Sequence, residues 1–151
     1  KNYLIRQGIA PYVDSSLINF SDENIASGRK DMDSREINKL ALSPQFGGTE
    51  INPSVLEKQL QGDAFILSLS DGEIENWSSI KQEYEKIVKD RPYVHIQIGS
   101  KNQFTKDLEK ANIPVQYVTK GDELAKLMID LTKSNYSRRK KWLIHFMTQR
   151  S

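Results

Sequence analysis

One short segment in the middle of the chain limits the fold more than any other. Residues 64–69 form a brief apolar run that suits a buried strand, and the run stops at Ser70-Asp71-Gly72. A helical pattern begins near Glu75. A buried strand that leads through a sharp turn into a helix is typical of an open parallel sheet, where ligands bind at the carboxyl ends of the strands. Asp71 is therefore the first candidate site residue.

The same alternation of strand and helix continues through the second half of the chain. Strands separated by helices of this length imply right-handed crossovers. We therefore predict an α/β protein with a three-layer, Rossmann-like open sheet that is mostly parallel and has helices on both faces. The predicted strands are 64–69, 93–98 and 115–118, and the predicted helices are 75–89, 103–111 and a last one from Asp122 that carries Leu124, Leu127, Met128 and Leu131 on one face.

The first half of the chain carries shorter elements with clear end signals. Pro53 suits the first position of a helix, and Asn52 before it is a natural cap. The predicted elements are the end of an amphipathic helix over 2–13, a strand at 16–20, a short edge strand at 25–30, a helix over 33–41 and a helix over 53–60.

Composition narrows the class of protein. With 151 residues, 37% hydrophobic and 28% charged, the chain suits one compact globular domain. No apolar run approaches the roughly 20 residues that cross a bilayer, and no secretory leader opens the chain. The absence of cysteine excludes disulfides and thiolate metal sites. These features predict a protein without a transmembrane segment, and we expect a cytoplasmic location.

Charge divides the chain into a domain and a tail. The tail, residues 137–151, contains five basic residues and no acid, whereas the domain, residues 1–136, is net acidic. Large apolar side chains follow the basic cluster, so we expect the tail to dock on the domain or on a partner protein; an acidic membrane surface is the alternative. Nucleic acid is less favoured, because the net charge is only +2. The candidate tail contacts are Arg138, Arg139, Lys140, Lys141 and Trp142.

The order of several strand ends and loops resembles that of the von Willebrand factor type A (VWA) domain. The resemblance covers about residues 2 to 136 and depends on the joint order of the motifs, since none of them is specific alone. The matching segments are Ile18-Asn-Phe-Ser-Asp22, the loop Gly47-Gly-Thr49, Leu67-Ser-Leu-Ser-Asp-Gly-Glu73, Ile96-Gln-Ile-Gly99 and Val115-Gln-Tyr-Val118 with the helix after it.

The resemblance implies a protein-interaction module with a metal-ion-dependent adhesion site. In that family a Mg²⁺ ion lies above the sheet between three loops, and a carboxylate of the partner completes its shell. Thr49 matches the second loop and Asp71 the third, and Gly48, Gly72 and Asp22 are further binding candidates. Oxygen ligands of this kind suit Mg²⁺. The implied partner is another protein chain or a subunit of a multi-protein assembly.

The chain departs from the family at the first loop. It contains no Asp-x-Ser-x-Ser motif and no strand before the segment at 2–13. A parallel sheet without its middle strand would leave buried backbone groups unpaired, at about 1–3 kcal/mol each. We therefore expect an upstream continuation, a partner chain or the apolar part of the tail at 143–147 to supply that strand. We expect Mg²⁺ to bind weakly or not at all to this chain alone.

The main candidates also have purely structural interpretations, and the proposed function has a rival. The Asp71-Gly72 pair is also a common strand-ending turn, and Thr49 also suits a helix cap. His95, between apolar neighbours, is more typical of a hydrogen-bonded core residue than of a metal ligand. The rival function is a magnesium-dependent phosphotransferase or phosphatase of haloacid dehalogenase type with Asp71 as the nucleophile. That family has a second aspartate two residues later, where this chain has Glu73, so we predict a binding module rather than an enzyme.

Overall fold

The computed structural model describes residues 6, 14–28, 30–31, 35–42, 48–60, 64–131 and 133–134. From the predicted helix over 2–13 it describes only Arg6, which is helical. The tail at 137–151 lies outside the described residues. No helix in the described part of the chain is long and apolar enough to cross a membrane.

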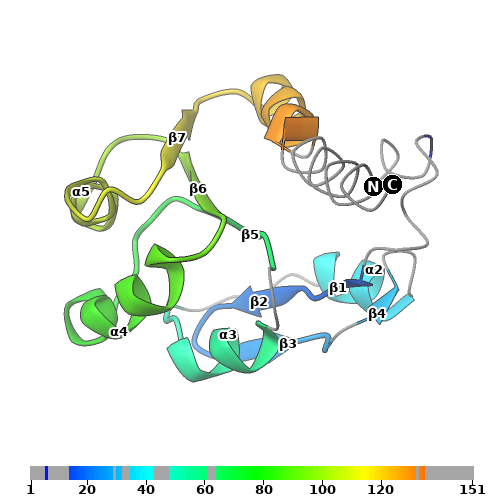
Figure 1. Cartoon of the computed structure of the whole chain (residues 1–151), viewed down its shortest axis with the longest axis horizontal. Coiled ribbons are helices and arrows are strands. Elements are labelled where there is room, and N and C mark those ends of the chain that lie inside the picture. Colours follow the sequence, from blue (N-terminus) through cyan, green and yellow to red (C-terminus); the bar gives the residue numbers. More distant parts are fainter. Residues whose placement is uncertain are drawn as a thin grey trace, which may run out of the picture.

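A three-stranded parallel sheet forms the centre of the second half of the chain (Figure 1). Its order is β5 (Ile66–Ser70), β6 (Tyr93–Ile98) and β7 (Val115–Val118), with Ile66 opposite Tyr93 and His95 opposite Val115. Helix α4 (Trp77–Lys89) connects β5 to β6, and α5 (Gln103–Lys110) connects β6 to β7. The α/β class and the alternation of strands with helices are therefore confirmed.

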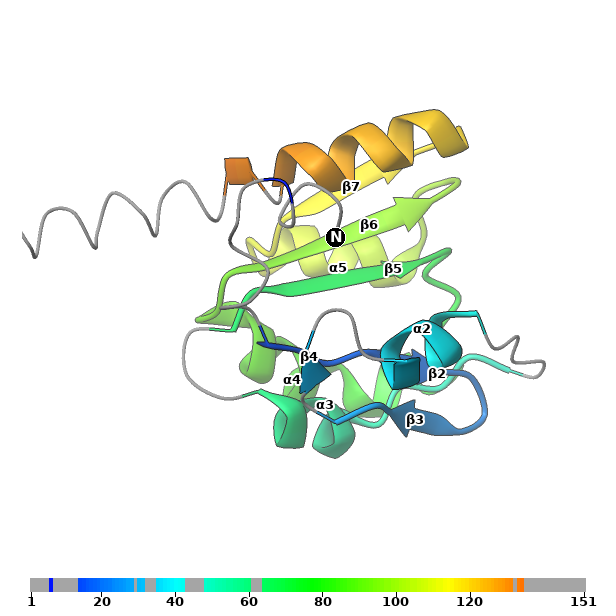
Figure 2. The same ribbon diagram turned by 90° about the vertical axis from the view of Figure 1, so that its right-hand side faces the viewer.

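Aromatic rings attach α4 and α5 to one face of this sheet. The ring of Trp77 in α4 lies edge-on to Phe104 in α5, with centroids 4.6 Å apart, and Phe104 lies edge-on to His95 in β6 at 4.9 Å. Tyr84 contacts Tyr93 in the same way at 6.1 Å. Residues 121–131 form the predicted last helix, which lies on the other side of β7 from α5 (Figures 1 and 2).

The first half of the chain forms two small antiparallel pairs. Strand β2 (Ile18–Phe20) pairs with β3 (Asn24–Ala26), and β1 (Asp14–Ser15) pairs with β4 (Lys30–Asp31). The strand predicted at 16–20 is confirmed only over Ile18–Phe20, and within the described residues β2 bonds to β3 and not to the parallel sheet. The physical reason is the three-residue turn between β2 and β3, because so short a connection can join only antiparallel neighbours. The hairpin lies on the side of β5 away from β6 (Figure 2).

Two further helices follow the sequence signals closely. Helix α2 spans Arg35–Ala41 and α3 spans Pro53–Gln59. The side chain of Asn52 accepts a hydrogen bond from the Ser54 amide, as its capping role predicts. Helix α4 begins at Trp77, two residues later than predicted, because Glu75 and Asn76 bond to another segment of the chain.

Candidate functional site

Three loops meet at the carboxyl edge of the parallel sheet. They are the turn after β2, the loop after β5 and a segment between α2 and α3, residues 48–52, which we call the bridging segment. The bridging segment is bonded to the turn on one side and to the loop on the other. It therefore joins the hairpin to the parallel sheet.

Three hydrogen bonds attach the bridging segment to the hairpin. The Glu50 amide donates to the Ser21 carbonyl at 2.8 Å. The side chain of Asn24 donates to the Glu50 carbonyl at 3.0 Å and accepts from the Asn52 amide at 2.9 Å. One asparagine at the start of β3 thus binds the bridging segment through both ends of its amide.

The other side of the bridging segment is bonded to the loop after β5 in a similar way. The Glu75 amide donates to the Thr49 carbonyl at 2.8 Å. The side chain of Asn76 accepts from the Ile51 amide at 3.1 Å and donates to the Ile51 carbonyl at 2.9 Å. These bonds place Thr49 beside the loop that begins at Asp71.

Asp71 lies directly after β5 with its side chain exposed. One carboxylate oxygen, Oδ1, accepts a hydrogen bond from the Glu73 amide at 3.2 Å, which forms a tight turn. The Asp71 carbonyl accepts from the side chains of Gln97 and Asn102. The carboxylate does not cap α4, because the N-cap of that helix is Asn76. The structural role of Asp71 is therefore to form the turn that ends β5.

The two predicted glycines lie where an added Cβ would meet a neighbouring side chain. Gly72 has a φ of +73°, and a Cβ there would lie 2.6 Å from Gln97 Oε1 and 2.7 Å from Asn102 Nδ2. A Cβ on Gly48 would meet the carboxylate of Glu75. Both glycines therefore allow backbone to approach neighbouring side chains at the sheet edge.

The remaining predicted positions lie near the same edge or outside the described residues. Thr49 is half-buried, and Asp22 is exposed and accepts a hydrogen bond from the Ser21 hydroxyl at 2.9 Å. The tail residues Arg138, Arg139, Lys140, Lys141 and Trp142 lie outside the described residues. Among the residues that the structure describes, no three His, Cys, Asp or Glu side chains are arranged to hold a metal ion.

Exposed acidic side chains gather on these three loops. Such a group creates a negative potential that attracts cations and repels anions. Its members are Asp22, Glu23, Glu50, Asp71, Glu73 and Glu75.

A chain of buried polar side chains leads from the sheet interior to this edge. Ser68 Oγ lies 2.8 Å from His95 Nδ1 and 2.6 Å from the Tyr93 hydroxyl, which lies 2.7 Å from the Tyr84 hydroxyl. On its other side, His95 Nε2 lies 3.0 Å from Gln97 Oε1. The expectation that His95 is a hydrogen-bonded core residue is confirmed, since its side chain is 1% exposed.

Burial determines the protonation states of the side chains in this hydrogen-bonded network. Desolvation lowers the pKa of His95 from its usual 6.5 and raises the pKa of Tyr84 and of Tyr93. All three side chains are therefore neutral at neutral pH. Although Ser68 and His95 are as close as a nucleophile and its base, the histidine is enclosed in the interior, so we assign the pair to the packing of the sheet.

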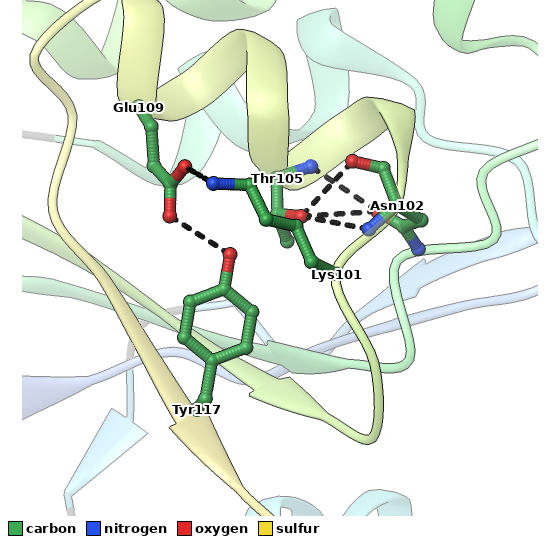
Figure 3. A network of polar contacts seen from close by, with 5 residues as sticks. All are labelled: Lys101, Asn102, Thr105, Glu109 and Tyr117. Carbon is green, nitrogen blue, oxygen red and sulfur yellow. Dashed lines mark hydrogen bonds and ion pairs between the residues drawn. The ribbon is translucent and has the colours of Figure 1, made fainter.

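The loop after β6 is fastened to α5 and β7 by an exposed network (Figure 3). The ammonium group of Lys101 pairs with the carboxylate of Glu109, which also accepts a hydrogen bond from the Tyr117 hydroxyl at 2.8 Å. The hydrogen bond with Lys101 lowers the pKa of Glu109, and Tyr117 adds to this effect. The network holds the residue that precedes Asn102.

Four amide side chains that the sequence analysis missed hold the candidate site together: Asn24, Asn76, Gln97 and Asn102. Three of them stand at a strand end or at a helix N-cap, where amide side chains bond to backbone groups. The Asn102-x-x-Thr105 spacing is a capping signal that the sequence does contain.

Comparisons of the chain with protein-family models, with curated proteins and with solved structures found no match.

Proposed function

We propose that this chain is a protein-interaction module of VWA type that binds its partner at the carboxyl edge of the sheet. The observation that carries the proposal is the bridging segment, which brings Thr49 to the loop of Asp71 through the bond from the Glu75 amide. Hydroxyl and carboxylate oxygens from two loops at one sheet edge suit a hydrated Mg²⁺ ion.

The arrangement of the strands supports the finer fold that the proposal requires. The hairpin lies beyond the edge of β5 that is not bonded to β6 (Figure 2). We propose that the hairpin and the three parallel strands belong to one Rossmann-like, three-layer open sheet, and that a further strand completes it between β2 and β5.

The acidic edge explains why a cation would be needed for binding. A partner's carboxylate would be repelled by Asp71 and its acidic neighbours, and a divalent ion held at Asp71 and Thr49 would reverse that repulsion. The partner is therefore a protein that presents an exposed acidic side chain. The ion would keep several of its waters, because few protein oxygens are available to replace them.

Paramagnetic broadening by Mn²⁺ tests the metal site. Mn²⁺ added to the ¹⁵N-labelled chain should broaden the amide signals of Gly72 and Glu73 and those of the bridging segment. Asp71→Asn should remove this effect. Asp90→Asn is the matched control, because Asp90 is an exposed acid that follows α4 and precedes β6, at the opposite edge of the sheet. Broadening that survives Asp71→Asn would contradict the proposed site.

Peptide display tests the partner. Peptides selected on the chain in the presence of Mg²⁺ should carry an acidic residue, and they should lose binding with a chelator or with Asp71→Asn. Binders that need neither Mg²⁺ nor Asp71 would contradict the proposal. The rival phosphatase is tested in the same preparations: turnover of a generic phosphate ester that Asp71→Asn abolishes would replace the binding module by an enzyme.

A further inference from the structure

We propose that Gln97 and Asn102 are positioning residues of the Asp71 site. Their side-chain amides, which we call the amide clamp, hold the carbonyl of Asp71 and so determine where its carboxylate lies. This inference rests on the proposed function and adds the residues on which binding at Asp71 depends.

Both arms of the clamp reach the same acceptor. Asn102 Nδ2 donates to the Asp71 carbonyl at 2.8 Å, and Gln97 Nε2 donates to the same oxygen. Gln97 Nε2 also donates to the Ser100 carbonyl at 3.0 Å, and its side chain is fully buried. A carbonyl oxygen has two lone pairs, so two donors saturate it. The peptide between Asp71 and Gly72 is thereby fixed.

The interior of the sheet allows only one orientation of Gln97. If its amide were rotated, Oε1 would face the carbonyls of Asp71 and Ser100, and three acceptors would meet without a proton. Gln97 Oε1 must therefore face His95, so Nε2 of the neutral imidazole carries the proton. His95 thus fixes Gln97, which in turn fixes the Asp71 carbonyl.

The second arm is anchored to a helix. Asn102 is the N-cap of α5: its Oδ1 accepts from the Thr105 amide at 3.2 Å, and Thr105 Oγ1 accepts from the Asn102 amide at 3.0 Å (Figure 3). The same side chain uses its Nδ2 for the clamp. The oxygen end of Asn102 therefore stabilises α5, whereas its nitrogen end serves the Asp71 loop.

The Asp71 carboxylate is restrained from the other side as well. Its Oδ1 accepts from the Glu73 amide, and this bond requires the turn at Gly72, whose positive φ brings the two residues together. The clamp holds the backbone before this turn. Release of the clamp should therefore loosen the carboxylate while β5 and α5 stay in place.

Variants of Asn102 separate the two uses of its side chain. Asn102→Ser and Asn102→Asp retain an oxygen for the α5 cap but lose the Nδ2 donor, and they differ in charge. Gln97→Met removes the buried arm, and Gln103→Met is its control, because Gln103 bonds to Asp107 within α5. The two readouts are Mn²⁺ broadening at Gly72 and hydrogen exchange of the Glu73 amide.

We expect Asn102→Ser to weaken the Mn²⁺ effect at Gly72, and both Asn102 variants to speed exchange at Glu73 by about five-fold, which corresponds to one lost hydrogen bond. Amide protection within α5 should stay as in the unmodified chain, and Gln103→Met should leave both the Mn²⁺ effect at Gly72 and exchange at Glu73 unchanged, because its lost bond lies within α5. If Gln97→Met fails to fold, the Asn102 pair decides.

Two results would overturn the inference, and they are distinguishable. An unchanged Mn²⁺ effect in Asn102→Ser would refute the clamp and leave the metal site standing. No Mn²⁺ effect at Gly72 in the unmodified chain would refute the proposed function and the role of the clamp together.

Discussion

Asn76 stands at the N-cap of α4, yet its side chain bonds to Ile51 and not to the helix. Its Oδ1 accepts from the Ile51 amide at 3.1 Å, and its Nδ2 donates to the Ile51 carbonyl at 2.9 Å. The Asn76 side chain therefore makes no capping hydrogen bond to the first turn of α4. The residue therefore serves the bridging segment at the expense of its own helix.

Replacement of Asn76 should release the bridging segment in two steps. Asn76→Asp keeps the acceptor for the Ile51 amide and loses one bond, whereas Asn76→Ala loses both. Because a hydrogen bond contributes about 1 kcal/mol, the free energy of unfolding should fall by about 1 and about 2 kcal/mol. Urea titrations measure the two values, and equal losses in the two variants would contradict the assignment.

Gly72 and Gly99 allow backbone strain to be separated from steric overlap. Both have a positive φ, +73° and +88°, but a Cβ on Gly99 would meet no atom within 4 Å. Gly99→Ala should therefore lower the free energy of unfolding only through backbone strain, by about 1 kcal/mol. Gly72→Ala adds the overlap with Gln97 and Asn102 and should lose more stability. Thermal melts compare the two variants, and an equal loss of stability would mean that the side chains of Gln97 and Asn102 move aside for the added Cβ.

The buried histidine should make stability depend on pH. Because burial lowers the pKa of His95 below 6.5, the unfolded chain binds a proton that the folded chain refuses. The contribution of His95 is complete above pH 6.5 and is lost as the pH falls below that value. Each unit of pKa lowering corresponds to about 1.4 kcal/mol. Urea titrations at pH 7.5 and 5.5 should show this loss in the unmodified chain and a smaller one in His95→Gln.

Magnesium should bind this chain weakly. In the proposed site Asp71 and Thr49 would supply only two protein contacts, and Mg²⁺ gives up its waters reluctantly unless several fixed oxygens replace them. Calorimetry on the 151-residue chain should detect no tight site. A dissociation constant below about a micromolar would show that further ligands complete the site.

The free edge of β5 should be occupied in the folded state. Within the described residues β5 bonds only to β6, and an open strand edge recruits another strand. We expect an upstream segment, a partner chain or the apolar part of the tail to fill it. Sedimentation and hydrogen exchange test this: a strictly monomeric chain with protected β5 amides and no added strand would contradict the architecture.

Periodicity predicted the elements of the second half well because each strand there is an apolar run with a clear stop. Strands β6 and β7 begin and end at the predicted residues. The three-residue turn between β2 and β3 explains their pairing, but the position of this hairpin against the parallel sheet could not be predicted from its own residues, because it depends on distant segments. For the same reason the sequence suggested Asp71 and Thr49 but not the amide side chains that bring their loops together.

The directions of the buried hydrogen bonds separate the Asp71 loop from changes in the protonation of His95. With the His95 proton on Nε2, Ser68 donates to Nδ1, Tyr93 donates to Ser68, and Tyr84 donates to Tyr93. A second proton on the imidazole would bind at Nδ1 and reverse the direction in which these three hydroxyls donate. The change would therefore end at Tyr84 in α4. The Nε2 bond to Gln97 would not change. The Asp71 loop is therefore insulated from acidification of the interior, although both ends of the sheet share one polar chain.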